Sequence, residues 1–207
     1  MGAGDRLQLT NGEGAMVVCE LTGARKNQCR VKPGEVKLEP PRPRRLTLGV
    51  ALLKNAARVE WLLEKTTEMG VHRIVPLLTH RTIREKFRID RMKAILVSAM
   101  LQSQQSWLPE LTEPVSFDAL FKQSFIPSIT HRYIAHCLPN RREEWMAQDL
   151  AVQNDVMILI GPEGDFTPEE IETAIGHGCR PVALGPNRLR TETAAMAAVA
   201  GYYLKNA

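Results

Sequence analysis

The stretch that decides the fold class of this chain is Val156-Met157-Ile158-Leu159-Ile160-Gly161-Pro162-Glu163-Gly164. Its first five residues are apolar without interruption, which is typical of a strand buried on both faces of a parallel sheet. Two glycines follow, and glycine lets the backbone take a positive φ or approach a ligand closely. The next residues, Thr167-Pro168-Glu169-Glu170, fit a helix start with a capping box. The stretch therefore predicts a strand, a loop and a helix in that order.

Segments on either side repeat this alternation. Continuous apolar runs predict further strands at residues 46–53, 73–78, 133–137 and 181–184. Apolar residues at helical spacing predict helices at residues 59–69 and 89–100, and a final helix begins near residue 191. Such an order is typical of an α/β fold with a parallel sheet and helices on both faces. Ligands bind such sheets at the carboxyl ends of the strands, although a glycine turn there also suits a loop that binds nothing.

A second strand-to-helix stretch is Leu184-Gly185-Pro186-Asn187-Arg188-Leu189-Arg190-Thr191-Glu192-Thr193-Ala194. The helix that it opens is rich in alanine, so a neighbouring backbone can approach it closely. That suits a helix–helix dimer contact or an element threaded through a crowded site. Unpaired backbone N–H groups at its start favour anionic or electron-rich ligands. A capped hydrophobic helix that binds no ligand is the alternative.

The first forty residues have a different pattern. Alternating apolar residues predict short strands near residues 7–9, 16–19 and 29–32, with a tight turn at Asn11-Gly12 and a stop at Pro33-Gly34. Three prolines in residues 40–43 then predict a stiff, extended linker. We place the domain boundary there, between residues 1–40 and residues 46–207. Forty residues are too few to close a β-barrel comfortably or to be stable alone.

The distribution of charge also distinguishes the N-terminal segment from the rest of the chain. The 207 residues carry a net charge of +4, and residues 1–45 hold the whole excess, with nine Lys/Arg against five Asp/Glu. A second basic concentration lies at residues 81–93. Basic clusters of this kind suit a polyanionic partner such as nucleic acid, or are solvated surface.

Composition excludes several classes of protein. The chain is 44% hydrophobic and 24% charged, which is ordinary for a globular protein and argues against disorder. No apolar stretch approaches the ~20 residues of a membrane span, and the first residues do not form a secretory signal. We therefore expect a cytoplasmic protein that does not associate with a membrane and carries four free thiols.

Motifs for other chemistry are missing from the sequence. The dinucleotide, phosphate-loop and serine-nucleophile patterns do not occur. His136-Cys137 and His177-x-Cys179 lack the paired spacing of zinc sites, so we expect no metal site.

Together, residues 159–164 and 184–194 resemble the paired motifs of the RsmE family, which are 16S ribosomal RNA (uracil-N3)-methyltransferases of the SPOUT superfamily. The upstream strings that also resemble this family are Glu60-Trp61-x-x-x-Lys65-x-x-Glu68-x-Gly70-Val71, Ile74-x-Pro76-x-x-Thr79-x-Arg81 and Gln102-Ser103. The resemblance covers residues 46–207 almost completely.

The resemblance implies a SPOUT-type parallel sheet with a C-terminal deep trefoil knot, preceded by a partial PUA-like β-barrel that binds RNA. It further implies homodimerisation through the knot, a small ribosomal subunit as partner, and S-adenosyl-L-methionine as cofactor. By position, the residues that would bind the cofactor are His136, Cys137, Leu138, Ile160, Gly161, Pro162, Glu163, Gly164, Leu184, Gly185, Asn187, Arg188, Leu189, Arg190, Thr191, Thr193 and Ala194.

Uracil N3 carries a proton and is a poor nucleophile until that proton leaves, so the site needs a base or groups that stabilise the uridinate. Arg190 is our candidate for stabilising the anion. Glu163 or Glu192 is the candidate proton acceptor, and Arg188 could instead contact a phosphate or the cofactor carboxylate. The candidate RNA-binding residues are Arg6, Arg25, Lys26, Arg81 and Arg84.

Two departures from the family pattern are visible. Gly4-Asp5-Arg6-Leu7 matches the end of a region whose earlier strands would precede Met1, so we expect an incomplete barrel. Asp165 stands where many relatives have a second glycine; its carboxylate could face a cationic cofactor or only cap the helix. Two alternative functions stay open: a knotted RNA-binding protein without turnover, because the N-terminal strands are missing, and a SPOUT methyltransferase that acts on another RNA.

Overall fold

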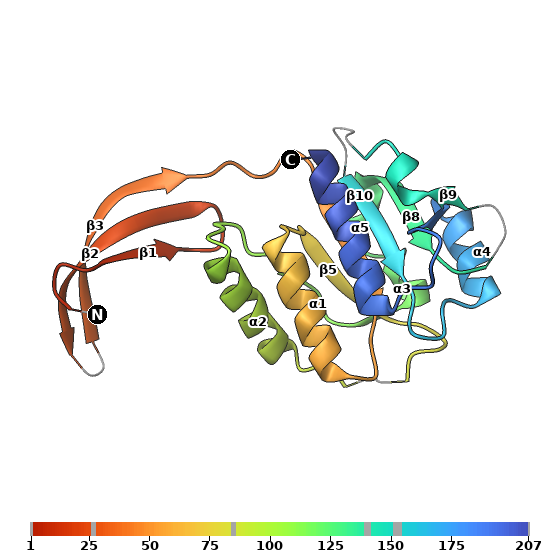
Figure 1. Ribbon diagram of the computed structural model, residues 1–207, viewed down its shortest axis with the longest axis horizontal. Coiled ribbons are helices and arrows are strands. Elements are labelled where there is room, and N and C mark those ends of the chain that lie inside the picture. The colour runs from red at the N-terminus through yellow and green to blue at the C-terminus, as the bar shows by residue number, and fades with distance from the viewer. Residues whose placement is uncertain (1, 26–27, 84–85, 139–141, 151–154, 207) are drawn as a thin grey trace.

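A computed structural model describes residues 2–25, 28–83, 86–138, 142–150 and 155–206 of the chain. A three-stranded sheet extends from one side of a larger α/β unit (Figure 1). The three strands, in the order β1-β2-β3, are β1 (Arg6–Thr10), β2 (Ala15–Arg25) and β3 (Gln28–Leu38). Both pairings in this sheet are antiparallel.

The larger sheet has the strand order β6-β5-β4-β10-β8-β11-β9, with β7 also paired to β5, and its pairings are parallel. Its strands are β4 (Leu46–Ala51), β5 (Arg73–Leu78), β6 (Glu110–Leu111), β7 (Val115–Ser116), β8 (Ile129–Ala135), β9 (Glu143–Glu144), β10 (Asp155–Ile160) and β11 (Cys179–Ala183). The predicted parallel α/β sheet is confirmed.

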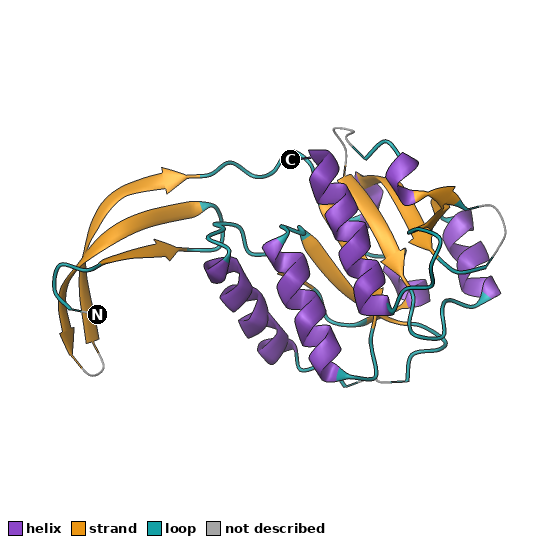
Figure 2. Cartoon of the chain, in the orientation of Figure 1, coloured by secondary structure: helices purple, strands orange, loops and turns teal. Residues whose placement is uncertain are grey.

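Helices cover both faces of this sheet. They are α1 (Ala56–Glu68), α2 (Ile89–Gln102), α3 (Phe117–Leu120), α4 (Pro168–Gly176) and α5 (Thr191–Asn206), with short 3₁₀ turns η1 (Ile126–Ser128) and η2 (Trp145–Ala147). Helices α1, α2 and α5 lie over one face (Figure 2), whereas α3 and α4 contribute to a second core on the other. No helix among the described residues is both long and apolar enough to cross a membrane.

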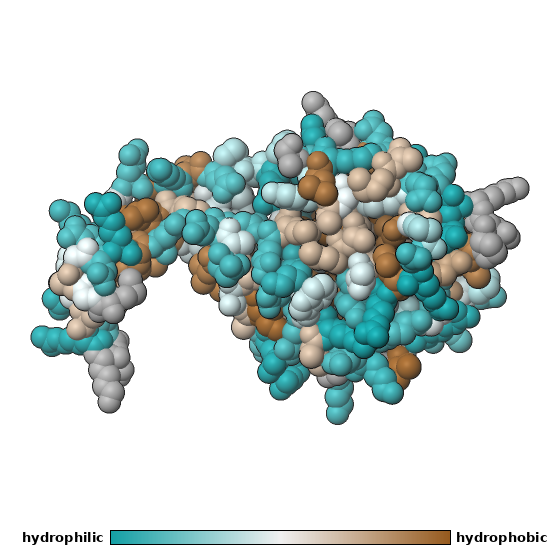
Figure 3. Space-filling model, in the orientation of Figure 1, coloured by the Kyte–Doolittle hydropathy of each residue, from teal (hydrophilic) through white to brown (hydrophobic). Residues whose placement is uncertain are grey.

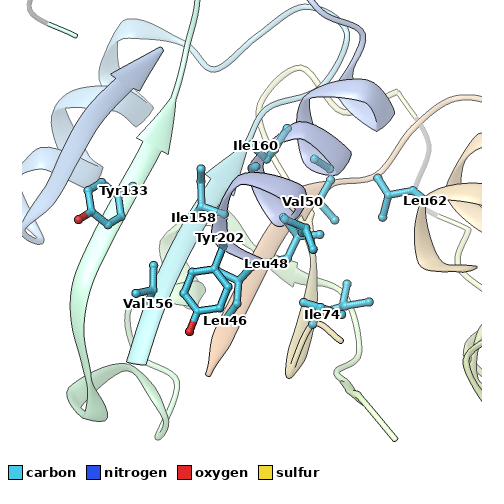
Figure 4. Close-up of a cluster of buried hydrophobic side chains, with 14 of the residues drawn as sticks. Leu46, Leu48, Val50, Leu62, Ile74, Tyr133, Val156, Ile158, Ile160 and Tyr202 are labelled. Atoms are coloured by element: carbon cyan, nitrogen blue, oxygen red, sulfur yellow. The ribbon is translucent and has the colours of Figure 1, made fainter. Parts of the chain in front are cut away.

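Strands β4 and β10 lie next to each other within the sheet, and burial on both faces explains their continuous apolar sequences. All six residues of β4 are buried, and the last five residues of β10 are buried as well. Val156, Ile158 and Ile160 of β10 belong to the core beneath α5, and Figure 4 shows them beside β4, with Tyr202 of α5 packed over them. Met157 and Leu159, which alternate with them, belong to the core on the opposite face. A strand buried on both faces permits few polar residues on either.

The predicted stop at Pro33-Gly34 is wrong, because β3 continues through it. Proline lacks a backbone N–H and is tolerated in a sheet at an edge strand or a bulge. Strand β3 lies at an edge of its sheet, and the register shifts between Val17 and Cys19, which faces Pro33. Proline therefore sits at an irregularity in the pairing and does not end the strand.

Residues 39–45 contain no helix or strand, in agreement with the predicted linker. Polar contacts nevertheless hold this junction to the α/β unit. The Arg42 guanidinium donates to the Gly70 carbonyl at 2.6 Å and to Gln105 Oε1 at 2.9 Å. Trp107 Nε1 donates to the Glu39 carbonyl at 3.2 Å. The three-stranded sheet is thus attached at defined points.

Candidate cofactor and active site

A cavity of about 300 Å³ opens where the carboxyl ends of β8, β10 and β11 meet the start of α5. These strands are neighbours in the order β10-β8-β11, so the loops that follow them come together at one edge of the sheet. The proposed cofactor residues that line this cavity are His136, Cys137, Ile160, Gly161, Pro162, Glu163, Leu184, Gly185, Asn187, Arg188, Leu189, Arg190, Thr191 and Ala194.

Three of the proposed cofactor residues, Leu138, Gly164 and Thr193, are outside this lining. Four residues that were not proposed complete it, namely Ala135, Arg142, Val182 and Asp165. Ala135 and Val182 lie near or at strand ends, where their apolar side chains resemble ordinary core residues in the sequence. Arg142 belongs to no motif, so only the structure brings it to the cavity. Asp165 was visible as a departure from a family pattern, but not as a lining residue.

The loop after β10 is organised by short-range hydrogen bonds. The Asp165 N–H donates to the Pro162 carbonyl at 2.9 Å, which closes a tight turn, and Asp165 takes a φ of +67°. The predicted capping box follows: Thr167 Oγ1 accepts from Glu170 N, and the Glu170 carboxylate accepts from Thr167 N. Helix α4 therefore begins at a fixed point directly after the turn.

The start of α5 is tied to this loop through a buried contact. Thr191 Oγ1 donates to the Gly161 carbonyl at 2.9 Å. On the approach to α5, Gly185 has a φ of +120°, a conformation that residues with side chains rarely adopt. The two strand-to-helix stretches are thereby joined across the cavity.

The cavity contains charges of both signs. Three arginines, Arg142, Arg188 and Arg190, line it together with two carboxylates, the exposed Glu163 and the half-buried Asp165. Burial lowers the pKa of His136; the Asp165 carboxylate opposes this shift, and the nearby Arg142 adds to it. Its buried Nδ1 has no hydrogen-bond partner among the described residues. Burial and the Asp165 carboxylate raise the pKa of the Cys137 thiol, which is therefore not a thiolate.

The two candidate proton acceptors occupy different surroundings. Glu163 lines the cavity and is exposed. Glu192 is buried in the first turn of α5 and does not line the cavity. Its Oε1 lies 3.5 Å from Arg58 Nε on α1, and its Oε2 is buried without a partner in the described part of the chain. This geometry favours Glu163 for contact with a ligand in the cavity.

The candidate RNA-binding residues are distributed over two regions. Arg6 and Arg25 are exposed on the three-stranded sheet. Arg81 lies beside the loop after β10, where its guanidinium donates to the carbonyls of Gly164 and Phe166. Lys26 and Arg84 are outside the described residues. Within the ranges that the structure covers, no three His, Cys, Asp or Glu side chains are grouped to hold a metal ion.

Comparisons with known proteins identify the relatives of this chain. The model of the RNA methyltransferase domain family matches residues 40–202. A ribosomal RNA small subunit methyltransferase E from Rickettsia conorii is 28% identical over 95% of this chain and 79% of that protein.

Solved structures give the same result. A protein from Porphyromonas gingivalis described as a probable rRNA-methyltransferase is 35% identical, with a TM-score of 0.86 over 97% of this chain and 84% of that one. A Legionella pneumophila methyltransferase solved with bound S-adenosylmethionine is 31% identical, with a TM-score of 0.86 over 100% of this chain and 85% of that one. The chain therefore belongs to the RNA methyltransferase family, and within it to the ribosomal RNA small subunit methyltransferase E (RsmE) group.

Proposed function

We propose that this chain transfers a methyl group from S-adenosyl-L-methionine to N3 of a uridine in 16S ribosomal RNA of the small subunit. The observation that carries the proposal is the cavity at the carboxyl ends of β8, β10 and β11, into which both family-like stretches project. Relatives named as small-subunit rRNA methyltransferases support the substrate class. Because ribosomal subunits are its substrate, we propose that the reaction takes place in the cytoplasm.

The residues of the cavity fit this cofactor. Leu184, Leu189 and Ala194 provide apolar walls for an adenine ring, and the backbone of residues 160–163 and 184–190 provides N–H and C=O groups for its edge. The buried, unpartnered Nδ1 of His136 offers a further hydrogen-bonding group. A related structure contains S-adenosylmethionine.

When bound, the cofactor supplies a methyl group on a positively charged sulfur. Uracil N3 gives its electron pair to the methyl carbon, the S–C electron pair stays on sulfur, and the N3 proton passes to a base. We assign the base to Glu163, because it is the candidate carboxylate that lines the cavity. Arg190 stabilises the negative charge on the uracil carbonyls as the proton leaves, and Arg188 binds a phosphate or the cofactor carboxylate.

Radiolabelled methyl transfer to small subunits that lack the modification tests this function, with the product nucleoside identified by mass spectrometry. We expect label in N3-methyluridine. Label in another nucleoside or another RNA would favour a different substrate. Cofactor binding without any label would instead favour the RNA-binding protein without turnover.

Replacement of Thr191 by valine tests the link between the two cofactor stretches. Valine keeps the shape of the side chain but removes the donor to the buried Gly161 carbonyl. Loss of a hydrogen bond of about 1 kcal/mol corresponds to an affinity for S-adenosylmethionine about fivefold weaker. Isothermal titration calorimetry measures this change. Thr193→Val, at an exposed residue outside the cavity lining, is the matched control, and equal affinities of the two variants would contradict the prediction.

We further propose that residues 1–40 belong to a PUA-like RNA-binding domain and that residues 46–207 form the SPOUT methyltransferase domain. Exposed Arg6 and Arg25 on the antiparallel sheet support the first assignment. A deep trefoil knot would place α5 inside a loop of chain. Contacts with the segment that contains η2 support this topology, because Trp145 Nε1 donates to the Ala198 carbonyl and Lys205 Nζ to the Gln148 carbonyl.

We expect the protein to be a homodimer that associates through this region. Weakly apolar surface is visible over α5 (Figure 3), and Met146, Tyr203 and Leu204 are 52%, 46% and 71% exposed. Apolar surface of this kind is typical of an interface between subunits. Light scattering at micromolar concentration should give the mass of a dimer; a monomer mass would contradict the prediction.

A further inference from the structure

Asp165 is a pocket carboxylate to which the reaction described above gives no task. It lines the cavity between the loops after β8 and β10 and is half-buried. Its φ of +67° lies in the left-handed region, which costs free energy for most residues and less for aspartate. Helix α4 is already capped by Thr167 and Glu170, so Asp165 is not needed as its N-cap.

Hydrogen bonds fix the direction of this carboxylate. Oδ2 accepts from the Cys137 N–H at 2.7 Å, and Oδ1 accepts from the Phe166 N–H at 2.8 Å. Asp165 therefore connects the loop after β8 to the loop after β10, two segments that both line the cavity. Its charge is held in place before any ligand arrives, so little reorganisation is required on binding.

The Asp165 carboxylate shares the cavity with three positively charged arginines. Arg142, Arg188 and Arg190 suit the anionic groups of the substrate and the cofactor carboxylate. They also repel a positively charged sulfur. Glu163, Arg188 and Arg190 are exposed, so water screens their charges more effectively than those of the half-buried Asp165 and Arg142. Asp165 is consequently the lining carboxylate whose charge is least screened.

We propose that the Asp165 carboxylate makes the pocket prefer the cationic cofactor S-adenosylmethionine over S-adenosylhomocysteine, the product with an uncharged sulfur. The inference rests on the proposed function and adds a specificity-determining residue to it. Transfer of the methyl group removes one positive charge from the bound ligand, so the product loses its attraction to Asp165. The same carboxylate that favours entry of the cofactor thereby favours release of the product.

Calorimetric titration of the full chain with each of the two nucleosides tests this inference. We expect Asp165→Asn to weaken binding of S-adenosylmethionine about 3–10-fold and to change binding of S-adenosylhomocysteine less than about twofold. Asparagine tolerates the positive φ and removes the charge. Glu163→Gln is the matched control, since it removes a second carboxylate from the same cavity at an exposed position. We expect it to change the ratio of the two dissociation constants less than Asp165→Asn does.

Alkylation of Cys137, followed by mass spectrometry, reports whether the loops of the variant remain folded. Removal of the Asp165 charge should lower the pKa of this thiol and speed its alkylation relative to exposed Cys29. S-adenosylmethionine should still protect Cys137, which lines the cavity.

An unchanged ratio of dissociation constants in Asp165→Asn, or an equal weakening for both nucleosides, would overturn the inference, because Asp165 would then only connect the loops. A wild-type chain that binds neither nucleoside would instead refute the proposed function.

Discussion

Replacement of Arg190 by alanine should lower the rate of methyl transfer at least ~100-fold, as expected when a preorganised charge is removed from a transition state. Arg190 lines the cavity directly before the first turn of α5. In the proposed mechanism, its positive charge stabilises the uracil as the N3 proton leaves. Binding of S-adenosylmethionine should remain measurable, because the apolar walls and backbone groups proposed to hold it are unchanged. Single-turnover transfer to small subunits, together with calorimetric titration, separates these two effects.

Two further variants sharpen this result. Arg188→Ala removes a second arginine from the same cavity and should weaken binding of substrate or cofactor more than it slows transfer. Arg190→Lys keeps the positive charge and should restore part of the rate, although lysine lacks the planar fork of arginine. Turnover of Arg190→Ala at the wild-type rate would remove this residue from the mechanism.

Prediction from sequence succeeded where a single local rule determines the structure. Strand β5 has the predicted bounds, and β4 and β10 followed from uninterrupted apolar runs, because a strand buried on both faces permits few polar residues. The capping box of α4 followed equally directly from Thr167 and Glu170. The predicted end of a strand at Pro33-Gly34 was wrong because proline is compatible with an edge strand. The sequence does not reveal which strand will lie at an edge.

The residues of the candidate site also separate into those that a local motif predicts and those that only a tertiary contact reveals. Its glycine loops and the arginines of the α5 approach are adjacent in the sequence and were found there. Arg142 was missed because it follows β8 at a distance and reaches the cavity only through the folded chain. The pairing of Glu192 with Arg58 was missed for the same reason, since it joins residues more than a hundred positions apart. These tertiary contacts, and not the motifs, distinguish Glu163 from Glu192 as the carboxylate available to a ligand.

Trp145→Ala should cause the largest loss of stability, lowering the free energy of unfolding by about 3–5 kcal/mol, as for other buried Trp-to-Ala changes. The side chain is 2% exposed, and its ring packs edge-on against Tyr133 with centroids 5.1 Å apart. Its Nε1 donates to the Ala198 carbonyl at 3.0 Å. A Cβ on Gly201 would lie 2.9 Å from that nitrogen, so the helix surface is shaped to receive the indole. Urea denaturation at a fixed protein concentration measures the change.

Trp145→Ala should also affect the candidate active site. Trp145 packs against the middle of α5, whose first turn follows Arg190 and is tied to the loop after β10 by Thr191. Loosening this helix should therefore weaken binding of S-adenosylmethionine as well, even though Trp145 does not line the cavity. Trp145→Phe keeps an aromatic ring but loses the donor, so it should lower stability by only about 1–2 kcal/mol. A free energy of unfolding for Trp145→Ala within ~1 kcal/mol of the wild type would mean that α5 is held mainly by its contacts with β4, β10 and α1.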